Sequence, residues 1–233
     1  MTTRDYTGIY DPDTDFDRHF TRLTAQRIRR WFRPGDRVLE LGCATGLLTS
    51  FMAQADVTID AVERVPAYLD RARARELPNA TFLDADVMEV DPPGPYNHVV
   101  AAHIVNELPD PVGFLRRFES FLAPGGLVHT TVTNPASVHR LVAIEMGLIE
   151  RPDALSDRGQ NLATKEIFDQ AGFEALAAQA GLLCIHREPV MLKPLTNAQL
   201  AELPDEVIDG LDRVAWRFPE HGGLNYSIFV VDA

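Results

Sequence analysis

Residues 38–46, Val-Leu-Glu-Leu-Gly-Cys-Ala-Thr-Gly, constrain the fold of this chain more than any other segment. An apolar strand with one acidic residue, Glu40, leads into a turn that begins at Gly42 and ends at Gly46, and an apolar stretch follows at 47–53. Glycine tolerates positive φ and lets the backbone approach a ligand closely. A carboxylate beside such a turn attracts cationic groups. The segment predicts a strand, a glycine-rich turn and a helix, with a ligand site at the turn.

Short apolar runs and stretches of helical period alternate along the chain, as they do in a mostly parallel α/β sheet. The pattern predicts strands at residues 37–41, 58–62, 81–83, 98–102, 127–132, 182–190 and 226–231. It predicts helices at residues 15–32, 47–53, 66–76, 111–121 and 165–180, the last of them opened by Thr164.

The composition narrows the class of partner and the compartment. Against 22 basic residues the chain carries 34 acidic ones, and its net charge of -12 disfavours binding to nucleic acid or to an anionic membrane surface. Two cysteines, Cys43 and Cys184, stand far apart and predict neither a disulfide framework nor a zinc site. Without a signal segment or an apolar span of membrane length, the chain is expected to be cytoplasmic.

Arginines crowd the first predicted helix and the residues just after it. They are expected to form a solvated basic face. The residues are Arg18, Arg22, Arg27, Arg29, Arg30, Arg33 and Arg37.

The spacing acidic-x-Gly-x-x-x-Gly, made here by Glu40, Gly42 and Gly46, resembles motif I of the class I S-adenosylmethionine-dependent methyltransferases. A dinucleotide fingerprint would instead need glycine-like residues at 42, 44 and 47, and Leu47 departs from it. The resemblance implies that the acidic residue and the turn contact the cofactor. These residues are Glu40, Gly42, Cys43, Ala44 and Gly46.

Further matches follow in the order and spacing of that family. The second strand ends at Glu63, which by resemblance binds the ribose hydroxyls, with Arg64 beside the adenine. After the third strand, Asp86 is the carboxylate that the family directs at the adenine amine, and Val87 offers its backbone N–H; Asp84 is close enough to compete.

The fourth strand and its turn, residues 96–108, resemble those of small-molecule methyltransferases, and the resemblance places His103 near the methionine part of the cofactor. A structural role, as a neutral imidazole packed at the strand end, is the alternative to a catalytic one. The residues 124–126, Pro-Gly-Gly, also match the family. Asp91-Pro92-Pro93 precedes this strand, so it is interpreted as a rigid loop and not as the Asp-Pro-Pro-Tyr box of amide methylation. The resemblance implies a Rossmann-like, seven-stranded, mostly parallel sheet with helices on both faces and an antiparallel last strand.

In this scheme residues 1–233 form a single methyltransferase domain. Residues 1–33 are an N-terminal helical segment and 34–133 the cofactor-binding core, while 134–164 and 192–223 are helical insertions. Loops at the carboxyl ends of parallel strands carry ligands, so the first insertion is expected to cap the substrate, although it could also simply pack on the sheet.

The predicted reaction is transfer of a methyl group from S-adenosylmethionine to a small acceptor, leaving S-adenosylhomocysteine, with no metal. The acceptor is expected to be a hydroxylated or amino metabolite, methylated on O or N, from sugar or natural-product biosynthesis. His103, His19 and His139 are the candidate catalytic bases. A non-catalytic, cofactor-binding partner subunit and an NAD-dependent oxidoreductase remain as alternatives. The chain is expected to be a monomer or a homodimer.

Overall fold

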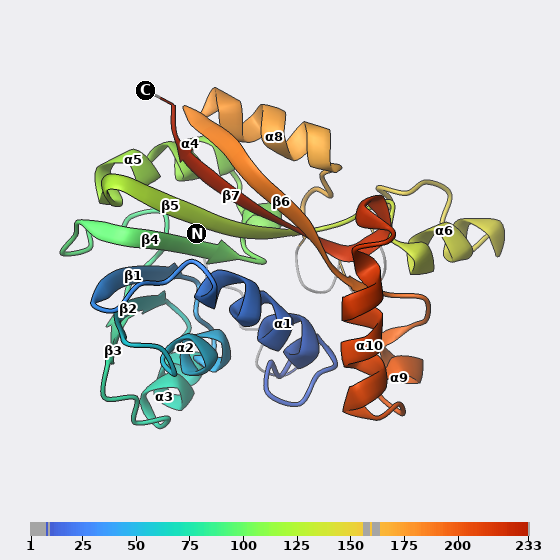
Figure 1. Cartoon of the computed structure of the whole chain (residues 1–233), viewed down its shortest axis with the longest axis horizontal. Coiled ribbons are helices and arrows are strands. Elements are labelled where there is room, and N and C mark those ends of the chain that lie inside the picture. Colours follow the sequence, from blue (N-terminus) through green and yellow to red (C-terminus); the bar gives the residue numbers. More distant parts are fainter. Residues whose placement is uncertain (1–7, 9, 156–158, 160–163, 233) are drawn as a thin grey trace.

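A computed structural model describes residues 8, 10–155, 159 and 164–232, and a seven-stranded sheet forms its centre (Figure 1). The spatial order is β3-β2-β1-β4-β5-β7-β6, and β7 runs antiparallel to both of its neighbours. The strands are β1 (Asp36–Leu41), β2 (Val57–Glu63), β3 (Ala80–Asp84), β4 (Tyr96–Ala102), β5 (Leu122–Thr133), β6 (Leu182–Leu192) and β7 (Gly222–Val231). The predicted Rossmann-like sheet with an antiparallel last strand is confirmed.

Helices cover both faces of the sheet. One face carries α1 (Asp17–Arg29), α2 (Leu47–Met52), α3 (Pro66–Arg73), α9 (Asn197–Leu200) and α10 (Asp205–Ala215); the other carries α4 (Pro111–Arg116), α5 (Phe118–Phe121) and α8 (Gln170–Gln179). The chain also forms the short 3₁₀ helices η1 (Val105–Glu107) and η2 (Pro219–His221). Helix α6 (Val138–Glu145) extends beyond the carboxyl end of β5 (Figure 1).

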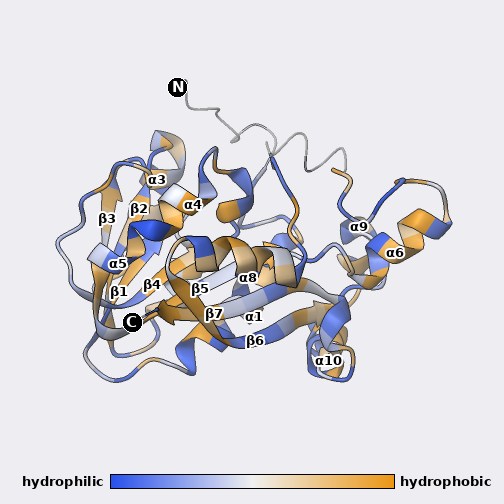
Figure 2. Ribbon diagram, turned by 90° about the horizontal axis from the view of Figure 1, so that it is seen from above, coloured by the Kyte–Doolittle hydropathy of each residue, from blue (hydrophilic) through white to orange (hydrophobic). Residues whose placement is uncertain are grey.

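The alternation of side chains along the strands builds a separate hydrophobic core on each face. Val38 and Val100 point to the core shared with α1 and α2, whereas Leu39 and Val99 point to the core shared with α4, α5 and α8. Figure 2 shows hydrophobic residues following the strands while the loops are mostly hydrophilic. Within the described ranges, every helix is too short or too polar to cross a bilayer.

The predicted helix at 165–180 begins later than expected, at Gln170. Its cap is Asp169, whose side chain accepts a hydrogen bond from the Gly172 N–H, and not Thr164. The Lys165 N–H donates to the Asn106 carbonyl at 2.8 Å, which holds this part of the chain against η1. A tertiary contact therefore outweighs the helical propensity of residues 165–169.

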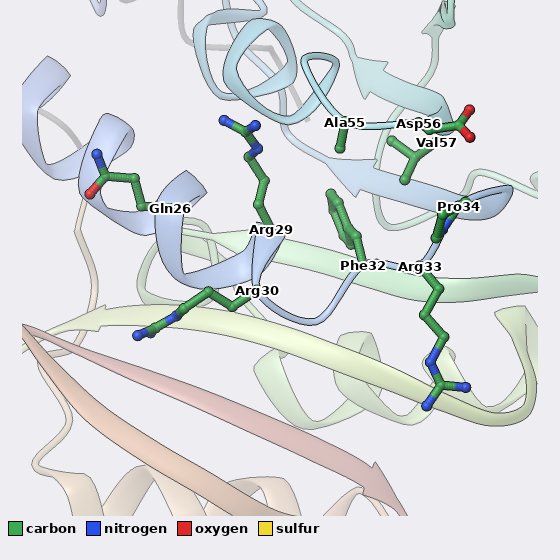
Figure 3. A pocket seen from close by; sticks show the side chains of 9 residues that line it. All are labelled: Gln26, Arg29, Arg30, Phe32, Arg33, Pro34, Ala55, Asp56 and Val57. Atoms are coloured by element: carbon green, nitrogen blue, oxygen red, sulfur yellow. The ribbon is translucent and has the colours of Figure 1, made fainter.

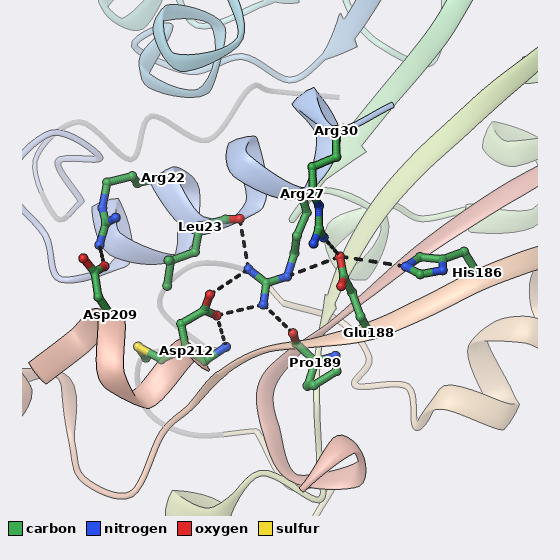
Figure 4. Close-up of polar contacts among 10 residues, drawn as sticks. Arg22, Leu23, Arg27, Arg30, His186, Glu188, Pro189, Asp209 and Asp212 are labelled. Atoms are coloured by element: carbon green, nitrogen blue, oxygen red, sulfur yellow. Dashed lines mark hydrogen bonds and ion pairs between the residues drawn. The ribbon is translucent and has the colours of Figure 1, made fainter. Parts of the chain in front are cut away.

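The solvated basic face expected along α1 is wrong for Arg27, whereas Arg30, just after the helix, is exposed as expected (Figure 4). Arg27 is 3% exposed, and its guanidinium binds Asp212 of α10 at 2.8 Å and the Pro189 carbonyl of β6 at 2.7 Å. Arg30 forms an ion pair with the buried Glu188. These arginines fasten the end of α1 to α10 and to the edge strand β6.

A row of buried polar side chains crosses the α1 face of the sheet. His98 Nε2 lies 3.0 Å from Asp36 Oδ2, His98 Nδ1 lies 2.9 Å from His129 Nε2, and His129 Nδ1 lies 2.7 Å from the Tyr226 hydroxyl. A carboxylate accepts only, so each neutral imidazole donates from Nε2 and accepts at Nδ1, and the tyrosine donates. The hydrogen bonds of this row therefore run in one direction, from the Tyr226 hydroxyl to the Asp36 carboxylate.

Burial lowers the pKa of His98 and lowers that of His129 well below its usual value of 6.5. Protonation of His98 would set two N–H groups against each other across the 2.9 Å contact, and protonation of His129 would set an N–H against the Tyr226 O–H across the 2.7 Å contact. The unfolded chain binds these protons more readily than the folded chain. The stability that the neutral histidines contribute is therefore complete above pH 6.5 and is lost as the pH falls through the lowered folded pKa values.

We expect His129→Gln to make stability less sensitive to acid. The amide can still donate to His98 and accept from Tyr226, but it does not titrate. Between pH 6.5 and 5, the free energy of unfolding should fall less steeply than in the wild type, by up to about 1.4 kcal/mol per pH unit. Urea denaturation at several pH values measures this slope, with His221→Gln as the control. Identical slopes in the two variants would contradict the prediction.

Candidate active site

The glycine-rich turn stands where the order of the strands reverses, between β1 and β4. The N–H groups of Gly42 and Cys43 both donate to the Val62 carbonyl of β2, and the Gly46 N–H donates to the Cys43 carbonyl at 2.8 Å. Gly42, Ala44 and Gly46 have φ angles of 82°, 46° and 72°. These positive φ values explain the glycines at both ends of the turn. In open α/β sheets, ligands bind in the crevice at such a reversal point.

Glu63 ends β2 and its carboxylate is held by three backbone N–H groups. One oxygen accepts from Arg64 N at 2.8 Å and Val65 N at 2.7 Å, and the other accepts from Ala44 N at 2.9 Å. The last bond joins the end of β2 directly to the glycine-rich turn. The structure thus brings together Glu63 and residues 42–46.

Glu40 is fully enclosed beneath the same turn. Its carboxylate accepts a hydrogen bond of 2.6 Å from the Thr49 hydroxyl of α2. Burial raises the pKa of Glu40 to about 7; the Thr49 bond opposes this rise, and the nearby Glu63 charge adds to it. A cation placed beside the turn would restore the charged form of this carboxylate.

Asp86 lies beyond β3 and faces Arg64. Its Oδ2 accepts from the Arg64 guanidinium at 2.8 Å and its Oδ1 accepts from Met88 N at 2.9 Å. Burial opposes but does not outweigh these bonds, and the pKa of Asp86 is lowered. Val87 follows as a buried residue. Asp84 is the exposed last residue of β3, and of the two carboxylates Asp86 is the one that pairs with Arg64.

His103 follows β4 with a φ of 60°, and its backbone N–H donates to both the carbonyl and the hydroxyl of Thr131 in β5. The next residue, Ile104, packs on the turn so closely that a Cβ built on Gly42 would meet its Cδ1 at 2.7 Å. Burial lowers the pKa of His103, partly offset by the charge of Asp17 on α1. His103 thus lies just after the end of β4, and burial favours its neutral imidazole.

His19 and His139 lie in other surroundings. His19 packs on the Phe16 ring, and burial lowers its pKa; nearby Arg18 adds to this effect, while the α10 carboxylates Asp205 and Asp209 oppose it. His139 lies on α6, with its Nδ1 3.0 Å from the Ser137 hydroxyl, and burial together with Lys193 and Arg140 lowers its pKa to about 3. No contact among the described residues joins either ring to the turn.

Glu107, in η1, is a further carboxylate that sequence reasoning left without a role. Burial raises its pKa to about 7, partly offset by Arg64, and the Glu63 charge adds to the rise. Its signal in the sequence was an acidic residue one turn after the fourth strand, on the same edge of the sheet as Glu63. Among the described residues, no group of three or more His, Cys, Asp or Glu side chains could hold a metal ion.

A groove of about 480 Å³ lies on the opposite edge of the sheet, near the starts of β1 and β2. Phe32 and Val57 contribute to its lining, and Figure 3 shows the guanidinium groups of Arg29, Arg30 and Arg33 pointing in different directions. The three cations do not converge on one point. Because the groove lies at the starts of β1 and β2, it is separate from the turn at the carboxyl end of β1.

Residues 16–178, more than two thirds of the chain, match the sequence profile of the family described as "Methyltransferase domain". The chain belongs to this family. The methyltransferase is also 31% identical over 106 residues to a ubiquinone biosynthesis O-methyltransferase of Xanthomonas campestris. That alignment covers 43% of the chain and 44% of the relative, so less than half of the relative's length is matched.

Solved methyltransferases share the fold at low sequence identity. CcbJ from Streptomyces caelestis superposes with a TM-score of 0.62 at 17% identity, covering 91% of this methyltransferase and 95% of CcbJ. DhpI, solved in complex with SAH, gives a TM-score of 0.60 at 17% identity, covering 97% and 89% of the two chains. These likenesses establish the class I methyltransferase fold.

We expect Glu40→Gln to stabilise the methyltransferase at high pH. The folded pKa near 7 exceeds the usual 4.5, so the protonated form favours folding, and this contribution is lost as the pH rises through about 7. Relative to the wild type, the variant should gain on the order of 3 kcal/mol between pH 4.5 and pH 8. Urea denaturation across this range, with the exposed Glu206→Gln as control, measures the gain; a constant difference between wild type and variant would contradict it.

We expect Gly46→Ala to cost more than Gly147→Ala. Both glycines have φ near 70°, but a Cβ at Gly46 would lie 3.1 Å from the Ala72 Cβ, whereas one at Gly147 would meet nothing within 4 Å. The left-handed conformation costs about 1 kcal/mol at each position, and crowding should add about 1 kcal/mol at Gly46. Denaturant melts of the two variants give the difference, and equal losses would show that Gly46 is not crowded.

Proposed function

We propose that this methyltransferase transfers the methyl group of S-adenosylmethionine to a small-molecule acceptor. The observation that carries the proposal is the Glu63 carboxylate, which is oriented by three backbone N–H groups and bonded to Ala44 of the glycine-rich turn. That turn lies at the strand-order reversal, where an open α/β sheet binds its ligand. Membership of the methyltransferase domain family supports the same conclusion.

The residues of this edge suit the parts of the proposed cofactor. A carboxylate offers about four acceptor positions, so beside its three N–H donors Glu63 retains one, on Oε2, for a ribose hydroxyl. Glu40, buried with a raised pKa, suits a cationic amino-acid tail near the turn. Arg64, Asp86 and Val87 would flank the adenine. When bound, S-adenosylmethionine supplies an electrophilic methyl group on a sulfonium.

The proposed acceptor is a hydroxylated or amino metabolite. The names of the curated relatives favour a hydroxyl oxygen as the atom that receives the methyl group. A hydroxyl must lose its proton as it attacks, and His103, kept neutral by burial beside the turn, would accept it. Alignment of the two reactants and exclusion of water would supply much of the remaining rate. His19 and His139 stay candidates for binding or deprotonating the acceptor.

The proposed domain plan treats the chain as one unit with the first insertion as the substrate cap. Helix α6 is tied back to the body by the His139 N–H, which donates to the Lys193 carbonyl at 2.9 Å. Its position beyond the carboxyl end of β5 suits this role (Figure 1). A reducing, cytoplasmic setting is proposed because Cys43 and Cys184 are both free thiols.

We expect S-adenosylhomocysteine to stabilise the protein and NADH not to do so. At a hundredfold excess over its dissociation constant, a ligand stabilises the folded state by about 2.7 kcal/mol, which raises the melting temperature by about 5–10 °C in a protein of this size. Glu63→Gln should weaken binding about tenfold to hundredfold, because a charged acceptor of several donors is lost. Thermal shift and calorimetry, with Glu206→Gln as control, measure both effects.

Turnover is then tested with S-adenosylmethionine carrying a labelled methyl group and a panel of phenols, sugars and amines. A larger shift with NADH would favour an oxidoreductase. Binding without turnover on any acceptor, together with activation of a second enzyme, would favour a non-catalytic subunit. Absence of S-adenosylhomocysteine binding would refute the proposal.

A further inference from the structure

A compact turn near the N-terminus, residues 11–15, lies against the glycine-rich turn. Its shape is set internally: the Asp13 N–H donates to Asp11 Oδ1 at 3.0 Å, and the Asp15 N–H donates to the Asp11 carbonyl at 2.9 Å. The Tyr68 hydroxyl of α3 donates to the Tyr10 carbonyl at 2.8 Å. These bonds hold residues 10–15 next to α3 and the end of β1.

The Asp13 carboxylate connects three elements. Its Oδ1 accepts from the Thr45 hydroxyl at 3.3 Å and from the Arg75 guanidinium, and its Oδ2 accepts from Arg71 at 2.5 Å. Arg71 also binds Asp11 at 2.7 Å. In this way one carboxylate joins the N-terminal turn to α3, to the residues just after α3, and to the glycine-rich turn.

Thr45 is held at its carbonyl and at its hydroxyl. The Arg75 Nε donates to its carbonyl at 2.6 Å, while its hydroxyl donates to Asp13. Thr45 is fully buried and lies between Ala44 and Gly46, both of which have positive φ. Glu63 therefore holds the turn from the cofactor side through Ala44, and Asp13 with Arg75 holds it from the outer side.

We infer that Asp13 and Arg75 are positioning residues for the cofactor. Without touching it, they hold Thr45 so that the backbone of residues 42–46 keeps the shape that receives the amino-acid tail. This inference rests on the proposed function, because it assigns that tail to the turn. It adds two residues, remote in sequence from the motif, that set the affinity of the site.

Asp13 and Arg75, which together form a clamp on Thr45, are expected to affect cofactor binding more than global stability. The side chains of Asp13 and Arg75 are 28% and 23% exposed, and ion pairs of this kind add little to the stability of a fold. Ordering a backbone turn before the ligand arrives removes a conformational entropy cost from binding. Loss of either residue should therefore weaken the cofactor while the ligand-free protein melts nearly as before.

The test measures the dissociation constant of S-adenosylhomocysteine by calorimetry for the full chain and its variants. Arg75→Gln and Asp13→Asn should each weaken binding about tenfold. The double variant should be little worse than either single variant, because both break the same clamp. Arg75→Lys should recover part of the loss, since an ammonium can serve one of the two acceptors but lacks the fork that serves both.

Salt gives a second readout. S-adenosylhomocysteine carries no net charge, so its affinity should depend on salt mainly through the exposed clamp. Wild-type affinity should fall between 0.05 and 0.5 M NaCl, roughly by the loss seen in Arg75→Gln, and the variant itself should respond weakly. The matched control is Arg73→Gln, which removes an exposed arginine at the end of α3, two residues before Arg75. Its guanidinium donates to the Phe82 carbonyl at 3.4 Å.

The inference is overturned if Arg75→Gln binds as tightly as Arg73→Gln, if the two single losses add independently, or if the melting temperature of the ligand-free variant falls in step with affinity. Hydrogen exchange of the ligand-free proteins separates this failure from failure of the proposed function. Suppose that the wild type binds no S-adenosylhomocysteine while residues 42–50 exchange faster in Arg75→Gln than in the wild type. The proposed function would then be refuted, and the clamp would remain as a structural device. Unchanged exchange together with normal binding would sink the clamp alone.

Discussion

The convergence of three backbone N–H groups on the Glu63 carboxylate organises the carboxyl edge of the sheet. It ties the end of β2 to the glycine-rich turn through Ala44, and it places negative charge beside the buried Glu40. Glu107 and Asp86 add two more carboxylates near the same point, where Arg64 is the neighbouring cation. The edge thus gathers several carboxylates, which suits a ligand that carries positive charge.

Much of the architecture could be predicted because its signals are local. Alternation along each strand and the glycines at both ends of one turn depend on residues close in sequence, and they led to the seven strands and to the pairing of Glu63 with residues 42–46. The order of strand ends predicted a site near His103, which the structure places just after β4, one residue before the Ile104 that packs on Gly42. No strand end fixes the positions of His19 and His139 in the sequence pattern, and the structure places the two histidines in different surroundings.

The remaining features depend on contacts between distant parts of the chain. Arg27 looks solvated in sequence because its partner Asp212 stands 185 residues away. The start of α8 moved to Gln170 because residues near Lys165 bind η1 instead of closing a first helical turn. Asp13 and Arg75, 62 residues apart, show no motif at all. Helical period and spacing carry no information about which charged groups will meet.

The one-way row from Tyr226 through His129 and His98 to Asp36 also restricts how this part of the core can vary. The donor and acceptor roles of each member are imposed by the next member. An apolar replacement at one position would therefore leave a buried polar atom of its neighbour without a hydrogen-bond partner. Exchange of the phenol and both rings for apolar groups of similar volume would leave fewer such orphans. Related chains should therefore keep these side chains together or lose them together.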